Sequence, residues 1–321
     1  YSIVDEAVKN VGKGAGSKQS GFVNAVLRQI VRHITRREAD LAGANPGRTL
    51  VQTPQSGCEF DTDFLPDPAT EVAAWLSVCF SLPSWLVDEW LDEFGPEQTR
   101  EICLACNRRP SLYVRANPLR TTPDVLLSRF QAAGVQAEPA RSVPVRACPE
   151  CAGGAYPDSA LRRHYEQEDA VSGSGMIRIA GPHAVTQLPG FAEGLFTVQD
   201  LSASHAVRIL DPHPGWSILD LCAAPGAKTT QIAEMSQDAA SITATDIDAA
   251  RLERLRENIA RLGVQSVTGV PHAYLEQGQA GPFDAILLDV PCSNTGVLAR
   301  RVEARFRVTP QAVKEIATIQ K

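Results

Sequence analysis

Short runs of β-branched and aliphatic residues alternate with helix-length segments in the C-terminal third of the chain. Strands separated by helix-length segments are typical of parallel sheets built from β-α-β units. The helix expected over residues 247–262 carries leucines and an isoleucine on one side and arginines on the other. The four runs are SILDLC (217–222), SITATD (241–246), residues 265–270 and FDAILLD (283–289). The sequence therefore predicts an α/β domain with a parallel sheet.

The turn after the first of these strands predicts a cofactor site. It lies in LDLCAAPGAKTT (219–230), where Ala-Pro-Gly joins a strand to a helix. A glycine there lets a ligand approach the backbone near the free N–H groups of the next helix. Ala227 stands where a phosphate-binding P-loop needs the glycine before its lysine, and the GxGxxG dinucleotide pattern is absent. The possibility that remains is a cofactor site of the adenosine type.

An acidic residue at the end of the second strand typically binds the ribose hydroxyls of such a cofactor. Asp246, in ATDID, has this position, and Asp248 is the nearby competitor. The alternative is that a strand-ending aspartate only caps the next helix.

A second candidate site is DVPCSNTG (289–296), at the carboxyl end of the fourth strand. Ligand sites in open α/β sheets form at this edge, so Asp289 and Cys292 are expected to face the crevice. An isolated cysteine is more often a small buried hydrophobe. Cys292, however, follows a proline in a polar loop, where a thiol can attack or protonate an electrophilic substrate.

The N-terminal part predicts helices over residues 3–11 and 20–37. In the second helix, Arg28, Arg32 and Arg36 fall four residues apart, opposite the apolar face. This stripe is either a solvated helix face or a set of phosphate contacts.

Residues 40–70 are rich in Gly, Pro, Asn and Asp without a sustained period, so a linker is expected there. Helices are expected over 70–107 with an interruption at Leu82-Pro83, then a strand at 112–115 and a helix at 122–133. Residues 139–175 predict an irregular insertion.

Bulk composition argues neither for a polyanion partner nor for a membrane. The chain has 31 Lys+Arg against 37 Asp+Glu, a net charge of −6, so a nucleic-acid partner needs a local basic patch. Neither a membrane-length apolar run nor a signal peptide is present, and a cytoplasmic protein is expected. The pairs Cys103/Cys106 and Cys148/Cys151 are too far apart for a zinc ribbon, so no metal is expected.

Several motifs, taken together and in order, resemble the Sun/Fmu family of 16S ribosomal RNA cytosine-5 methyltransferases. In the catalytic part these are LDLCAAPGAKTT, ATDID and LLDVPCSNTGVLARR, preceded by LPGFAEGLFTVQDLSASHAVRILDPHPGWSILDLC. GFVNAVLRQIVR resembles the last helices of the family's NusB-like RNA-binding domain. LPSWLVDEWLDEFG and NRRPSLYVRANP resemble its intermediate domain.

The resemblance implies S-adenosylmethionine as cofactor, with Asp246 on the ribose and Asp289 in contact with the cofactor or the cytosine. Ala227 stands where the family usually has a second glycine, and residues 269–274 lack the acidic residue expected at the adenine edge. Whether His272 substitutes for it is left open. The implied cofactor loop is Cys222, Ala223, Ala224, Pro225, Gly226, Ala227 and Lys228.

The resemblance also implies a mechanism with two cysteines. A thiolate adds to C6 of cytosine, which activates C5 for methylation, and a second thiol assists product release. In the family the nucleophile lies in a later Thr-Cys-Ser, and this sequence contains none. We therefore expect Cys292 to be the release cysteine and the chain, which starts at Tyr1 and ends at Lys321, to be a fragment.

Arg300 and Arg301, followed by Arg305 and Arg307, come just after the active-site loop and are expected to contact RNA phosphates. With RNA as the partner, the stripe of Arg28, Arg32 and Arg36 is expected to hold RNA as well. The expected partner is 16S ribosomal RNA, bound by a monomer. Two alternatives stay open: a non-catalytic RNA-binding or assembly factor that keeps the fold, and a cytosine-5 methyltransferase acting on tRNA.

The fold class expected is therefore α/β, with a Rossmann-like methyltransferase domain that is incomplete at its C-terminal end. The predicted parts are a partial NusB-like helical domain (1–40), a linker (41–70), an intermediate α/β RNA-recognition domain with the insertion (71–190) and the methyltransferase domain (191–321).

Overall fold

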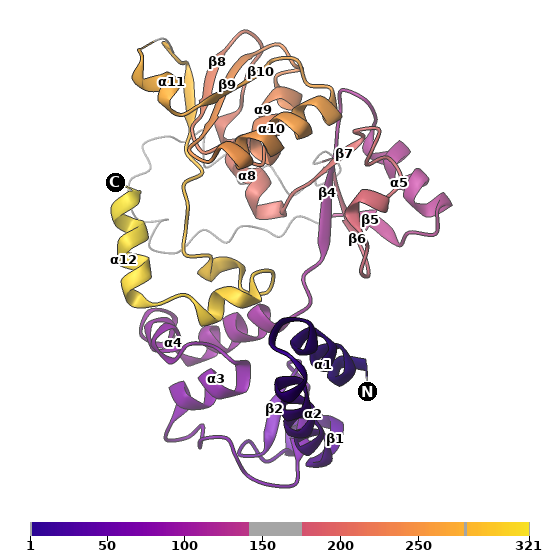
Figure 1. Ribbon diagram of the computed structural model, residues 1–321, viewed down its shortest axis with the longest axis vertical. Coiled ribbons are helices and arrows are strands. Elements are labelled where there is room, and N and C mark those ends of the chain that lie inside the picture. The colour runs from indigo at the N-terminus through magenta and orange to yellow at the C-terminus, as the bar shows by residue number, and fades with distance from the viewer. Residues whose placement is uncertain (1, 141–174, 279–280, 321) are drawn as a thin grey trace. The chain divides into compact units, whose positions relative to one another are not determined.

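The predicted parallel sheet is present, and its strands β8, β9 and β10 are labelled in Figure 1. The strand order is β10-β9-β8-β11. All neighbouring strands in it are parallel, and Pro271 of β10 pairs with Asp246 of β9. The carboxyl ends of the strands therefore meet at one edge. The strands are β8 (Ser217–Asp220), β9 (Ser241–Asp246), β10 (Val267–Pro271) and β11 (Ala285–Leu287).

Helices follow the first two strands as predicted. Asp248 caps α10, and Gly263 ends it in a left-handed conformation with φ 72°. Leu252, Leu255 and Leu262 form the buried stripe of this helix. The helices of this part are α8 (Leu201–Leu210), α9 (Ala227–Met235), α10 (Ala249–Leu262) and the short α11 (Ala273–Glu276).

A second, antiparallel sheet has the order β5-β6-β4-β7. Thr122 caps α5, whose Leu126 and Phe130 pack into an apolar cluster with residues of β4, β6 and β7. The elements are β4 (Leu112–Ala116), α5 (Pro123–Ala132), β5 (Ala137–Pro139), β6 (Met176–Ile179), the single-turn η3 (Val185–Gln187) and β7 (Phe196–Val198).

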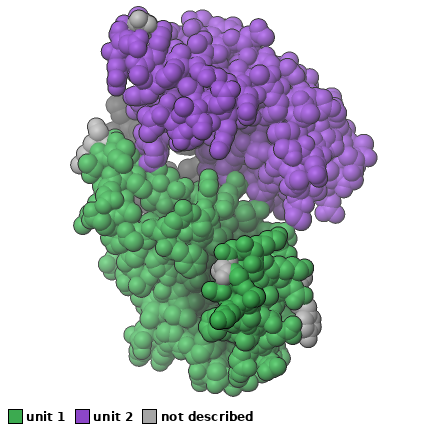
Figure 2. Space-filling model, in the orientation of Figure 1, with its two compact units in different colours: residues 1–110, 292–321 green, residues 111–291 purple. Residues whose placement is uncertain are grey.

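The computed structural model describes residues 2–140, 175–278 and 281–320. Most of the predicted insertion over 139–175 thus lies outside the described residues. The chain divides into two units, coloured in Figure 2: residues 1–110 with 292–321, and residues 111–291, which contain both sheets above. None of the helices in the described ranges has the length and hydropathy needed to cross a bilayer.

The first unit begins with α1 and α2 but then departs from the prediction. The chain leaves the helix at Arg32 and forms an antiparallel sheet of order β1-β3-β2. The predicted linker over 41–70 is therefore corrected, because two strands of this sheet, β2 and β3, lie within it. The elements are α1 (Ser2–Ala15), α2 (Ser17–Arg32), β1 (Ile34–Asp40), η1 (Leu41–Gly43), β2 (Thr49–Val51) and β3 (Ser56–Phe60).

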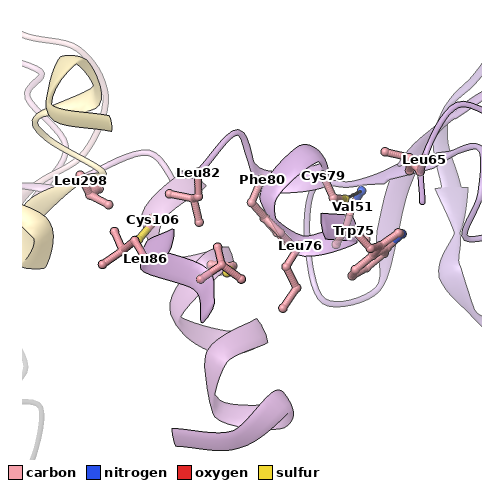
Figure 3. Close-up of a cluster of buried hydrophobic side chains, with 12 residues drawn as sticks. Val51, Leu65, Trp75, Leu76, Cys79, Phe80, Leu82, Leu86, Cys106 and Leu298 are labelled. Carbon is pink, nitrogen blue, oxygen red and sulfur yellow. Dashed lines mark hydrogen bonds between the residues drawn. The ribbon is translucent and has the colours of Figure 1, made fainter. Parts of the chain in front are cut away.

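Two helices, α3 (Val72–Phe80) and α4 (Ser84–Asn107), follow, with the break near Leu82-Pro83 that the sequence predicts. α4 contains a kink at Gly95, whose φ is 73°. Their apolar faces form a cluster that also contains Leu298, from the C-terminal segment (Figure 3). Residues 292–321 thus group with this unit by their contacts.

The C-terminal segment consists of short helical turns and one longer helix. Thr309 caps the longer helix, and Pro310 occupies its first turn. The elements are η4 (Thr295–Val297), η5 (Val302–Phe306) and α12 (Pro310–Ile319).

Candidate functional site

The candidate cofactor turn joins β8 to α9 and requires glycine at its last position. Gly226 has φ 104°, a conformation that L side chains rarely adopt. A Cβ added to it would lie 2.5 Å from Cδ1 of Leu255. The turn therefore has no room for a side chain at position 226, directly before the amino terminus of α9, where helix N–H groups lack intrahelical partners.

Side chains from β9 and α10 hold this turn in place. Arg251 Nη2 donates to the Ala224 carbonyl at 2.8 Å, and Asn258 Nδ2 donates to the Pro225 carbonyl at 3.0 Å. The hydroxyl of Thr245 donates to the Leu221 carbonyl at 2.7 Å. The turn is thus fixed by hydrogen bonds to its carbonyls.

Asp246 lies at the carboxyl end of β9 and is 5% exposed. Its Oδ1 accepts the Asp248 N–H at 3.0 Å, and its Oδ2 lies 3.4 Å from Arg251 Nη2. Asp248 accepts the N–H groups of Ala250 and Arg251, so Asp248 is the N-cap of α10. The capping alternative therefore applies to Asp248 and not to Asp246.

Lys228 and Asp289 are brought together in the second unit. The Nζ of Lys228, in the first turn of α9, lies 2.5 Å from Oδ2 of Asp289, two residues after β11. The Lys228 side chain is 17% exposed, whereas that of Asp289 is 54% exposed. The carboxylate is thus accessible to a ligand at this edge of the sheet.

A third carboxylate, Asp220, was not singled out from the sequence. It ends β8 and is 1% exposed; its Oδ2 accepts the Thr229 hydroxyl at 2.7 Å. Among the described residues its Oδ1 has no hydrogen-bond partner. Burial raises the pKa of Asp220 to about 6, and the charges of Asp289 and Asp246 contribute to the increase. Its position at the end of a strand, which is the reason that Asp246 was predicted, could also have identified Asp220 from the sequence.

The two cysteines of the predicted site differ in environment. Burial raises the pKa of the Cys222 thiol, and the carboxylates of Asp246, Asp220 and Asp289 raise it further, which disfavours a thiolate. Cys292 is exposed and belongs to the first unit. Its carbonyl accepts the Asn294 amide at 3.3 Å, within the polar loop that the sequence predicts.

The predicted arginine stripe is only partly on one helix. Arg28 and Arg32 are exposed on α2, where Arg28 donates to Asn24 at 2.8 Å. Arg36 lies in β1 and donates to Glu59 at 2.8 Å, so its assignment to the helical stripe is corrected. The helix ends before it because β1 pairs with β3.

The basic cluster after the loop of residues 289–296 is also divided. Arg300 and Arg301 are exposed, and Arg301 lies 3.7 Å from Glu303. Arg305 is buried instead, donating to the carbonyl of Phe80 at 3.1 Å and of Cys106 at 2.5 Å. Arg305 therefore ties η5 to the ends of α3 and α4 and does not face solvent.

The remaining candidate ligands are the two cysteine pairs and His272. Cys103 and Cys106 are buried in α4, and burial raises the pKa of Cys103 to about 12; Cys148 and Cys151 lie outside the described residues. The described ranges hold no group of three metal-binding side chains. His272 follows β10, and its Nδ1 is buried without a hydrogen bond to any described residue.

Two protein families match the sequence. Residues 207–321 match the family described as 16S rRNA methyltransferase RsmB/F, and residues 82–146 match the ferredoxin-like domain of RsmF/B-like methyltransferases. The ribosomal RNA small subunit methyltransferase B of Serratia proteamaculans is 38% identical over 247 residues, which are 74% of this chain and 48% of that protein. Its counterpart in Pectobacterium atrosepticum is 37% identical over 248 residues, 74% of this chain and 49% of that protein.

Solved structures share the fold. The crystal structure of PH0851 has a TM-score of 0.68 at 22% identity and covers 99% of this chain and 58% of its own. A methyltransferase homolog from Pyrococcus horikoshii has a TM-score of 0.54 at 24% identity, covering 74% of this chain and 68% of its own. The chain spans about half the length of the curated relatives it matches.

Proposed function

Because this chain belongs to the RsmB/F family of 16S rRNA methyltransferases, we propose that it takes part in methylating a cytosine of 16S ribosomal RNA at C5. The methyl donor is S-adenosylmethionine. One observation carries the cofactor assignment. A glycine-dependent turn lies among three carboxylates, those of Asp220, Asp246 and Asp289, at one edge of a parallel sheet.

The residues present fit this cofactor. Asp246 is placed for ribose hydroxyls, and the acidic surroundings suit a ligand that carries a sulfonium and an ammonium group. The loop Cys222 to Lys228, with Gly226 last before α9, presents backbone to the ligand. When bound, S-adenosylmethionine supplies an electrophilic methyl group. The chain's own residues bind and orient it.

Asp289 holds Lys228 at 2.5 Å and contacts the cofactor or the target cytosine through its exposed face. Cys292 assists product release, and its exposure keeps the thiol accessible to a nucleotide. We assign RNA phosphate contacts to Arg28, Arg32, Arg300 and Arg301. The target base must be unstacked to reach the cofactor, so a loop or single-stranded cytosine is the substrate.

Equilibrium binding of S-adenosylmethionine to the chain tests the cofactor assignment. Titration calorimetry should show binding that Asp246→Asn weakens by about tenfold or more, as expected for loss of a charged hydrogen bond to the ligand. Asp248→Asn, which keeps an acceptor for the α10 cap, is the matched control and should leave the affinity unchanged. No binding by the wild-type chain would favour a non-catalytic RNA-binding factor.

Methyl transfer by the full-length protein tests the substrate and the thiol. Transfer to naked 16S rRNA but not to tRNA is expected. Cys292→Ala should leave a covalent protein–RNA adduct on a denaturing gel, because product release is blocked after the adduct forms. Equal loss of adduct and product would instead identify Cys292 as the nucleophile.

A further inference from the structure

A buried arginine of the antiparallel sheet reaches the helix that follows the cofactor turn. Arg115, on β4, is 5% exposed. Its Nε donates to Oε2 of Glu234 at 2.6 Å and its Nη2 to Oε1 at 2.9 Å, a two-pronged pair with a residue of α9. Both partners lie in the second unit, so the contact joins the antiparallel sheet to helix α9 within one compact part of the chain.

The same guanidinium also contacts the first turn of α9. Its Nη1 donates to the Ala227 carbonyl at 3.0 Å, and its Nη2 donates to the Thr230 hydroxyl at 3.2 Å. That hydroxyl in turn donates to the Gly226 carbonyl at 2.9 Å. Hydrogen bonds therefore run from β4 to the glycine that shapes the cofactor turn.

A glutamine pair completes the network. Arg115 Nη1 also donates to Oε1 of Gln199, whose amide donates to Gln231 at 2.7 Å. Gln231 then donates to the Ser204 carbonyl at 3.0 Å, in α8. A lysine has the same charge but lacks the planar fork that meets these acceptors together.

A buried ion pair is weak evidence for net stability, because an apolar pair of similar volume is often as stable. The guanidinium of Arg115 instead sets the orientation of α9, because it holds the helix near both ends, at Ala227 and at Glu234. Lys228 and the loop glycine lie at the end nearer the proposed ligand.

We propose that Arg115 is a positioning residue for the cofactor site, supplied by the neighbouring sheet, which sets the position of the first turn of α9. The inference rests on the proposed function. Cofactor affinity therefore depends on a residue outside the Rossmann-like sheet and out of contact with the ligand.

The test replaces the pair by apolar residues. Arg115→Met with Glu234→Leu removes both charges, so neither is left buried alone, while the bonds to Ala227 and Thr230 are lost. We expect a melting temperature close to that of the wild type and S-adenosylmethionine binding, measured by titration calorimetry, weaker by about tenfold. Arg115→Lys, which keeps the charge without the fork, should give an intermediate loss.

Asn117 offers a matched control at the same junction. It is fully buried, and its amide donates to the carbonyls of Gly194 and Leu262 at 3.0 Å each, away from the cofactor turn. Asn117→Ala should lower the melting temperature and leave the dissociation constant within about twofold, since no bond to α9 is lost.

The outcomes are separable. Wild-type binding with unchanged affinity in both Arg115 variants would overturn the positioning role and leave the proposed function intact. If Asn117→Ala weakened cofactor binding as much as the Arg115 variants do, the loss of affinity would be explained by general destabilisation, and the positioning role would also be overturned. Absence of binding by the wild-type chain would overturn the proposed function and this inference with it.

Discussion

Lys228 Nζ lies 2.5 Å from Asp289 Oδ2, although 61 residues separate them in the chain. The pair joins the first turn of α9 to the segment after β11. Two motifs that stand apart in the sequence are thereby brought to one edge of the parallel sheet.

Asp289→Asn should weaken S-adenosylmethionine binding by about tenfold, because the unpaired Lys228 charge then lies beside a cationic ligand. Since Asp289 is half exposed, the free energy of unfolding should change by less than about 1 kcal/mol. Asp284→Asn is the control at the opposite edge, where Asp284 accepts the Ser217 N–H at 2.8 Å. Titration calorimetry that finds equal losses in both variants would contradict the assignment.

Gly226→Ala should destabilise the protein by more than Gly215→Ala. Both glycines have left-handed φ values, 104° and 83°, so both substitutions cost about 1–2 kcal/mol of backbone strain. Only at position 226 does the new Cβ collide, 2.5 Å from Leu255, whereas nothing lies within 4 Å at Gly215. A further loss of about 1–3 kcal/mol is expected in urea unfolding. Equal losses would show that Leu255 moves aside freely.

The parallel sheet and its turn could be predicted because their signals are local. Alternating strands and helix-length segments located β8 to β11, and the strand-end position of Asp246 follows from the same pattern. Asp220 also ends a strand, but it lies inside the motif LDLCAAPGAKTT, in which the turn after the strand was the feature that predicted a cofactor site. Burial is the main cause of its raised pKa, and the charges of Asp289 and Asp246, which raise the pKa further, come close to it only in the folded chain.

The sheet of residues 34–60 was missed for a physical reason. β1 reads ITRREAD and is exposed at most positions, so it shows neither an apolar run nor an alternation. Arg305 and Arg115 were not distinguished from surface arginines, because their acceptors lie 225 or 119 residues away in the sequence. Helix-end carbonyls carry no sequence signature, since every residue has one.

The raised pKa of Asp220 predicts a loss of stability with increasing pH. The carboxyl group holds its proton to about pH 6 in the folded chain but only to about 3.8 when unfolded. Its contribution to stability is therefore fully present below about pH 3.8 and lost as the pH rises through about 6. At about 1.4 kcal/mol per pKa unit, the loss is on the order of 3 kcal/mol.

Asp220→Asn isolates this effect from that of other carboxylates. The amide of the variant stays uncharged at every pH, so the variant does not lose this contribution. Its free energy of unfolding should therefore increase relative to that of the wild type from about pH 4 to pH 7. Urea denaturation across this range measures it. A difference that is constant with pH would mean that Asp220 ionises in the folded protein as it does in the unfolded chain.

The division of the C-terminal arginines predicts two separable phenotypes. Arg300→Ala with Arg301→Ala should reduce the salt dependence of RNA binding, with the slope of log K against log salt falling by about 1–2, because each lost phosphate contact removes about 0.7–0.9. Arg305→Leu should keep that slope but destabilise its unit by about 2–4 kcal/mol, because the carbonyls of Phe80 and Cys106 lose their donors. Filter binding at several salt concentrations and urea unfolding measure the two effects. An unchanged slope in the double variant would remove Arg300 and Arg301 from the RNA surface.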